Sequence, residues 1–183
     1  MELMGTGELL IGQLEFYWDV HFRPRLDGLT DAEYLWEPAQ PSWTVHPDGA
    51  GRIVMDQEVP EPSPAPVTTI AWRLVHIGVG CFAIRVNTFF EDNPDGADMF
   101  DARHRPADLP LTAAGGLAFL DHWYRRWHDG IRSMDEKALA RPLGPKAGPY
   151  ADDTMLGLIA HINRETIHHG AEICLLRDLY RAG

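Results

Sequence analysis

The sequence predicts an all-α fold, a four-helix bundle with a long proline-rich connection between its first and second helices. Four segments carry apolar residues three or four positions apart, the spacing that buries one face of a helix. Proline and glycine gather between these segments, with one long connection after the first and shorter ones later, as in many bundles. At 183 residues the chain most simply forms one domain, 1–183, large enough to bury a real core.

The first two helices have recognisable boundaries. The first is expected over about 7–23, because Pro24 interrupts its apolar pattern. The second is expected over about 69–90, where the pair Thr68-Thr69 can cap its first turn. Between them, the stretch 30–34 is expected to form a short helical turn closed by a capping box.

The last two helices are predicted in the same way. The third is expected over about 112–134, with Thr112 as its N-cap. The fourth is expected over about 152–182, which contains no proline, and Asp152 or Asp153 can serve as its N-cap.

The connection over about 37–67 is too long to be a simple turn. Its prolines are Pro38, Pro41, Pro47, Pro60, Pro62, Pro64 and Pro66. A loop of this length inside a compact domain is usually functional or disordered. Trp36, Trp43 and the short run 52–55 indicate that it packs down and includes a strand-like turn. We therefore expect a lid or wall beside a site, not a linker between domains.

The last helix carries two polar side chains on its apolar face. Continuing the apolar spacing from Ile162 to Ile173 places Glu165 and His169 on the buried side, with His169 near its centre. Residues four apart on a helix point to one spot, and burying them is costly unless both are satisfied. Two interpretations fit: paired ligands of one metal ion, as in HExxH helices, or a buried Glu–His hydrogen bond that joins helices.

His76 is the matching candidate on the second helix. On the helical wheel it shares a face with Gly80 and Ala83, which are small enough to let a neighbouring helix approach or to leave a hollow above the imidazole. Taken alone, His76 is better explained as an inward histidine that bonds to a carbonyl.

The composition limits the classes of function. A formal net charge of −11 argues against a surface for nucleic acid or anionic membrane. The two cysteines, Cys81 and Cys174, do not form a disulfide framework and fit a reducing compartment, so a cytoplasmic protein is expected. No signal peptide is visible, and no apolar run approaches the roughly 20 residues that cross a bilayer.

Three stretches of the chain resemble the DinB-like superfamily, which includes the metal-binding domain of mycothiol-dependent maleylpyruvate isomerases and related thiol S-transferases. They are Leu-Trp-Glu-Pro at 35–38, Trp-Arg-Leu-Val-His-Ile at 72–77, and the run 161–172 in the last helix. The resemblance covers nearly the whole chain. Family members carry one metal-binding histidine early in the second helix and two ligands four residues apart in the last.

Mapped onto this chain, the resemblance implies that His76, Glu165 and His169 bind a divalent metal ion. The isomerase branch is similar in using a His, Glu, His set, so Glu165 is an acceptable ligand. Zinc is the first candidate for the ion, with nickel and iron as alternatives, because imidazole and carboxylate ligands suit all three.

A second alignment gives another ligand. Matching on Gly170 alone makes His168 the ligand and puts Arg164 where the first ligand belongs, and an arginine cannot bind a cation. The helical wheel favours the first alignment, because His169 is central on the apolar face and His168 is not.

The resemblance also implies a reaction. A three-ligand site leaves an open position, where a low-molecular-weight thiol could become a thiolate or a water molecule could become a nucleophile. The resemblance favours the thiol. His161 or His168, near the site but off its centre, could be a supporting residue or general base; the alternative is that they are surface residues at the end of the bundle. The expected partner is a small-molecule substrate, and a homodimer is possible. The alternatives are a metal-dependent hydrolase and a non-catalytic, stress-related metal-binding bundle.

Overall fold

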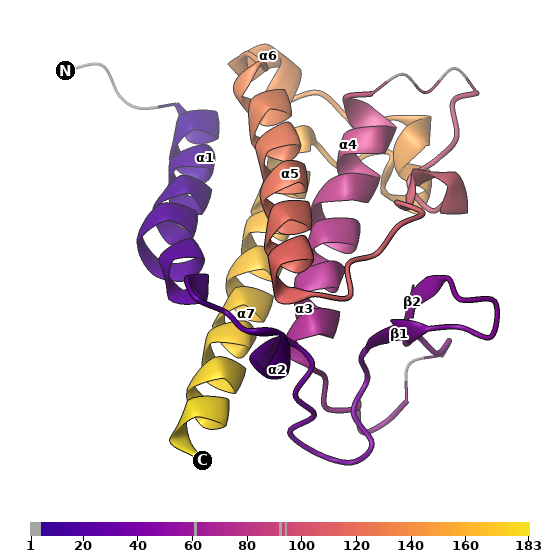
Figure 1. Cartoon of the computed structure of the whole chain (residues 1–183). Coiled ribbons are helices and arrows are strands. Elements are labelled where there is room, and N and C mark those ends of the chain that lie inside the picture. Colours follow the sequence, from indigo (N-terminus) through magenta and orange to yellow (C-terminus); the bar gives the residue numbers. More distant parts are fainter. Residues whose placement is uncertain (1–4, 61, 92, 94) are drawn as a thin grey trace.

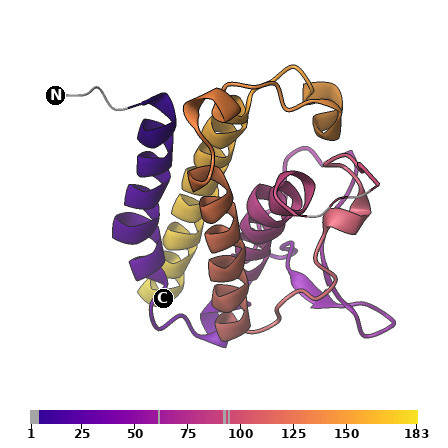
Figure 2. The ribbon, with the colours of Figure 1, turned by 90° about the horizontal axis from the view of Figure 1, so that it is seen from above.

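A computed structural model describes residues 5–60, 62–91, 93 and 95–183, and these form a bundle of four helical rods (Figures 1 and 2). The rods are built on α1 (Thr6–Phe16), α3 with α4 (Ile70–His76 and Ile84–Phe89), α5 (Ala113–Arg132) and α7 (Met155–Ala182). The predicted all-α class is confirmed, with one small two-stranded sheet added. Among the described residues, no helix combines the length and apolarity needed to cross a bilayer.

The directions of the rods explain the connections. In Figure 1, α1 and α7 run downward, whereas α3–α4 and α5 run upward. The connection from α4 to α5 therefore returns along the length of the bundle, and it contains the 3-10 turn Ala102–His104. Short helices lie at the ends of the rods: α2 (Asp31–Tyr34), α6 (Glu136–Leu139) and the 3-10 segment Pro145–Tyr150.

Two of the rods contain wide π-helical turns. The first rod continues from α1 through a π segment at Tyr17–Phe22 and a 3-10 segment at Arg23–Leu26. The second rod has a π segment at Ile77–Ala83, directly after His76. Because π turns bond residue i to i+5, they shift which side chains share a face, and they often occur at functional sites.

The helix starts follow threonine caps. The hydroxyls of Thr69 and Thr112 accept from the backbone N–H groups of Trp72 and Gly115, as the sequence predicted. The expected Asp152 or Asp153 cap is wrong: α7 begins at Met155, and Thr154 caps it by accepting from Gly157 N. The chain just before Thr154 is instead held by backbone bonds, with the Asp153 carbonyl accepting from Leu143 N.

The long connection folds into a hairpin fixed to the start of α3. Its strands, β1 (Val45–Pro47) and β2 (Ile53–Met55), pair antiparallel, so the predicted strand-like turn is confirmed. The Trp43 carbonyl accepts from Thr69 N at 2.9 Å, and the Trp72 indole N–H donates to the Asp56 carbonyl at 2.8 Å. The hairpin is therefore a wall built onto the helix that carries His76.

Gly170 allows α7 to pack closely against the first rod. A Cβ at this position would collide with Tyr17 Oη and lie 3.1 Å from Phe22 Cδ2. We expect Gly170→Ala to destabilise the fold by about 1–3 kcal/mol through overpacking, measured by urea unfolding. Gly12→Ala is the matched control, because a Cβ there meets nothing within 4 Å, and it should be neutral or stabilising. Equal effects of the two changes would contradict this account of the packing.

Candidate metal centre

The structure brings His76, Glu165 and His169 together inside the bundle. His76 is the last residue of α3, and α7 presents the other two one turn apart. The His76 and His169 rings lie edge to face, with centroids 4.7 Å apart and planes at 84°. His169 Nε2 lies 3.5 Å from Glu165 Oε2. His76 and Glu165 therefore each lie against His169, between the second and fourth rods, and the three residues are called the ligand cluster below.

The surroundings keep His76 neutral. The Trp72 ring stacks on its imidazole, with centroids 4.8 Å apart and planes 9° from parallel. Burial, together with the charges of His169 and Arg73, lowers the pKa of His76 to about 4, against the opposing effect of Glu165 and Glu172. A neutral imidazole offers a lone pair, which is the form that a metal ion binds.

The other nitrogen of His169 faces a carboxylate. His169 Nδ1 lies 2.8 Å from Glu172 Oε2 and 3.1 Å from the NH1 group of Arg73. Arg73 Nε in turn lies 3.2 Å from Glu172 Oε2. An arginine side chain can only donate a hydrogen bond, and a carboxylate can only accept one. If Nδ1 of His169 carries the hydrogen, it therefore bonds to Glu172 and not to Arg73. In that tautomer the lone pair of Nε2 points to the Glu165 side.

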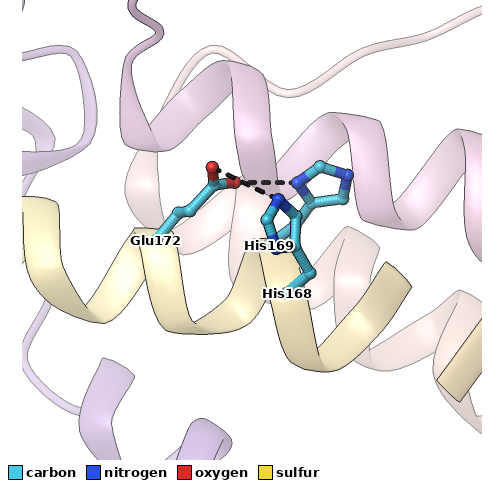
Figure 3. A group of neighbouring side chains, drawn as sticks. All are labelled: His168, His169 and Glu172. Carbon is cyan, nitrogen blue, oxygen red and sulfur yellow. Dashed lines mark hydrogen bonds and ion pairs between the residues drawn. The ribbon is translucent and has the colours of Figure 1, made fainter. Parts of the chain in front are cut away.

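A second group of possible ligands lies on α7 itself. One ligand atom each from His168, His169 and Glu172 lies within 4.8 Å of the others, and Figure 3 shows both imidazoles turned toward the Glu172 carboxylate. His168 Nε2 is 3.6 Å from Glu172 Oε1, and the His168 side chain is 64% exposed. The two groups share His169 but use opposite nitrogens of its ring.

The residues fit a metal ion better on the Nε2 side of His169. The positive Arg73 side chain already contacts both Nδ1 and Glu172, so a cation on that side would meet a like charge. The Glu165 carboxylate lies on the Nε2 side, and the neutral His76 ring also packs against His169. Ligating histidines usually donate their other N–H to a carboxylate, and Glu172 is placed to accept it. The ligand set His76, Glu165 and His169 stays a prediction.

The two predicted catalytic histidines, His161 and His168, lie at different distances from the cluster of His76, Glu165 and His169. His161 Nδ1 lies 3.7 Å from Glu165 Oε1 and accepts a 2.7 Å hydrogen bond from Arg164 NH2. His168 is exposed, and its ring centroid is 5.0 Å from that of His169. Their catalytic roles remain predictions, and a proton-accepting role for His161 requires Arg164 to release Nδ1.

Two cavities flank the cluster. One of about 270 Å³ opens on His76, and residues of the long connection, including Trp43 and Met55, form part of its wall. Its floor includes Gly80, where a Cβ would have only the His76 ring atom Cε1 near it, at 3.9 Å. The hollow above His76 was expected from the small residues that follow it. The structure adds Ile84 to the lining where the helical wheel had placed Ala83.

The second cavity, of about 430 Å³, lies on the other side of the cluster. His161 and Arg164 of α7 line it, together with Arg85 of α4 and Tyr150. Sequence reasoning missed Arg85, because nothing in the pattern separates it from the many surface arginines. It also missed Glu172, which a helical spacing of three from His169 could have suggested.

Neither cysteine of the chain is a ready nucleophile. Burial, with the charge of Glu165, raises the pKa of the Cys81 thiol to about 12. Burial also raises the pKa of Cys174. Both side chains are free thiols, and in both the raised pKa disfavours the reactive thiolate form.

Comparison with known proteins agrees with the predicted helical fold. A family model described as the DinB superfamily matches residues 13–173. No curated protein and no solved structure gave a significant match. The matched range includes the hairpin wall and the helices that carry His76, Glu165 and His169. The chain therefore belongs to the DinB superfamily, whose members generally bind a metal ion.

Proposed function

We propose that this protein is a metal-dependent enzyme that activates a low-molecular-weight thiol for S-transfer or isomerisation. The observation that carries the proposal is the shared position of His76, which belongs both to the ligand cluster and to the wall of the 270 Å³ cavity. A small molecule in that cavity would lie beside the cluster. The raised pKa of both protein cysteines disfavours their thiolate forms, which supports an external thiol as the sulfur donor.

Zinc is the first candidate for the ion, with nickel and iron as alternatives. His76, Glu165 and His169 would hold it, and it would favour the thiolate form of a thiol within reach, the form that attacks an electrophile. The donor set of two imidazoles and one carboxylate is typical of open zinc sites.

The protein's own residues would prepare the site for this reaction. Glu172 would accept a hydrogen on Nδ1 of His169 and so keep the Nε2 lone pair on the side of Glu165. Arg73 offsets the charge of Glu172 and fixes its position. Trp72 holds the His76 ring by stacking, and Trp43 extends this apolar wall along the cavity. A dry wall of this kind strengthens the electrostatic interactions beside it.

The proton of the thiol needs an acceptor near the cluster. His161 is the better placed of the two predicted bases, because it contacts Glu165, and it would accept the proton on Nδ1 once Arg164 releases that nitrogen. Burial lowers the pKa of His161, which favours its neutral form. His168 contacts Glu172 and would act as a positioning residue.

The proposal is tested with N-acetylcysteine as thiol and 1-chloro-2,4-dinitrobenzene as electrophile. The metal-loaded protein should accelerate loss of the thiol, and a chelator should remove at least about nine-tenths of that rate. p-Nitrophenyl acetate without thiol is the matched control. Ester cleavage that requires metal but no thiol would support a hydrolase instead. A protein that retains no metal would support the non-catalytic bundle.

A further inference from the structure

The larger cavity, of about 430 Å³, has an apolar wall and a cationic end. Phe100, Leu143 and Leu158 supply apolar surface, and the chain segments before α5 and before α7 form two of its sides. Arg85 and Arg164 supply positive charge. A cavity with this composition would suit a molecule with an apolar body and a charged group.

Arg85 is a partly buried arginine, and among the described residues no ion pair joins it to a carboxylate. In the part of the chain that the structure describes, its Nε is buried and has no hydrogen-bond partner. Other arginines that are partly or fully buried bind carboxylates: Arg23 binds Asp121, Arg73 contacts Glu172 and Arg177 binds Glu33. The chain has 27 acidic residues against 16 basic ones, so a shortage of carboxylates does not explain the difference.

A partly buried guanidinium whose Nε has no hydrogen-bond partner is costly to maintain. Arginine stays protonated in proteins, although burial lowers the pKa of Arg85 below its ordinary value. Removing the charge from water without a partner destabilises the folded state. An anion entering the cavity would satisfy this group, and a planar carboxylate matches the two-pronged geometry of guanidinium.

The neighbours of Arg85 add donors to the same cavity. Arg164 donates to His161 Nδ1 at 2.7 Å, so the neutral His161 ring carries its hydrogen on Nε2 and is a donor there. Arg164 also lies 3.4 Å from Glu165 Oε1, which offsets part of its charge. Asp153 is the carboxylate that lines the cavity, and among the described residues no ion pair joins it to Arg85. The balance of charge at this end is positive.

We propose that this cavity binds a small organic anion, a carboxylate carried on an apolar or aromatic body, with Arg85 as its main partner. Arg164 and His161 would contribute further donors, and the wall of Phe100, Leu143 and Leu158 would hold the body. His161 links the cavity to Glu165 at 3.7 Å. That the anion is also the electrophilic substrate rests on the proposed function, whereas the binding of the anion does not.

Calorimetric titration of metal-depleted protein tests the binding. Benzoate should bind, and its neutral isostere benzamide should bind about tenfold more weakly or worse, because a charged hydrogen bond is lost. Arg85→Gln should weaken benzoate binding by a similar factor and leave benzamide unchanged. Arg125→Gln, a change at an exposed arginine, is the control and should alter neither affinity.

A stability measurement separates a ligand-binding role from a structural one. Without ligand, Arg85→Met should raise the thermal midpoint by about 2–4 °C, because it removes an unpaired charge from a partly buried position. A fall in the midpoint would indicate that Arg85 supports the fold and would overturn the proposal. Equal affinity for benzoate and benzamide, or for the parent and Arg85→Gln proteins, would also overturn it, as would inorganic phosphate binding more tightly than benzoate. None of these results depends on metal or thiol chemistry, so they stand apart from the test of the proposed function.

Discussion

The His76→Ala variant should lose metal binding, whereas His168→Ala should keep it. Both residues are histidines whose rings lie close to that of His169, with centroids 4.7 Å and 5.0 Å from it, and the proposed ligand set includes only His76. His76 and Glu165 complete this donor set, so removing either should reduce bound metal from about one ion per chain to near zero. Metal content after dialysis against zinc, nickel or iron(II), measured by mass spectrometry, gives the result.

Two further variants sharpen this comparison. His169→Ala should abolish binding whichever nitrogen is used, because both groups need this residue. Glu172→Gln should weaken binding by about 10–100-fold without abolishing it, as expected when a carboxylate that orients a ligand is removed. The opposite pattern, in which His168→Ala and Glu172→Gln lose the metal and His76→Ala retains it, would place the ion on the Nδ1 side. Far-ultraviolet circular dichroism controls for folding.

Glu33→Gln should destabilise the protein by about 3–5 kcal/mol. Glu33 is 3% exposed and binds Arg177 Nε at 3.0 Å. Arg177 also donates to the carbonyl oxygens of Arg25 and Asp27, which ties α7 to the segment after the first rod. Without the carboxylate, Arg177 is a buried charge whose partner has gone, and breaking such a pair is costly. Chemical unfolding with urea measures the loss.

The same residue predicts a dependence on pH. Burial raises the pKa of Glu33, but hydrogen bonds from Thr30 and from Arg177 and Arg181 outweigh it and hold the pKa at about 2, against an ordinary value of 4.5. The folded state therefore gains stability from this carboxylate above about pH 4.5, and loses roughly 3 kcal/mol as the pH falls toward 2. Glu33→Gln should lack this part of the acid sensitivity.

An exposed ion pair between α7 and the first rod provides the matched control for Glu33→Gln. Asp178 binds Arg25 at 2.6 Å, but the two side chains are 61% and 48% exposed. Asp178→Asn should cost less than about 1 kcal/mol, as exposed ion pairs usually do. A cost as large as that of Glu33→Gln would show that burial does not distinguish the two pairs.

The rods of the fold could be predicted because their local signals agree with their packing. Thr69 and Thr112 cap helices whose apolar spacing is regular, so both starts were found. The start of α7 was predicted too early, because backbone bonds from the preceding loop to Asp153 decide where the helix begins. Element boundaries of this kind depend on contacts that a helical wheel does not include.

The candidate site was predictable only where its residues follow an ordinary helix. Glu165 and His169 lie four apart in α7, and their convergence follows from that spacing. The lining beyond His76 does not, because the π segment Ile77–Ala83 shifts the face by part of a turn and brings Ile84 to the cavity. Arg85 could not be identified from the sequence, because residues distant in sequence, such as Phe100 and Tyr150, form the cavity that it lines.

The hairpin of the long connection has a consequence for how specificity can change. It is bonded to Thr69 and Trp72, in the first turn of the same helix that ends at His76. Met55 of the hairpin and Gln57, which follows it, line the 270 Å³ cavity but do not belong to the ligand cluster. Under the proposed function, substitutions in this segment would alter which molecules fit the cavity while the proposed ligands His76, Glu165 and His169 stay as they are, so recognition and reactivity would be free to evolve separately.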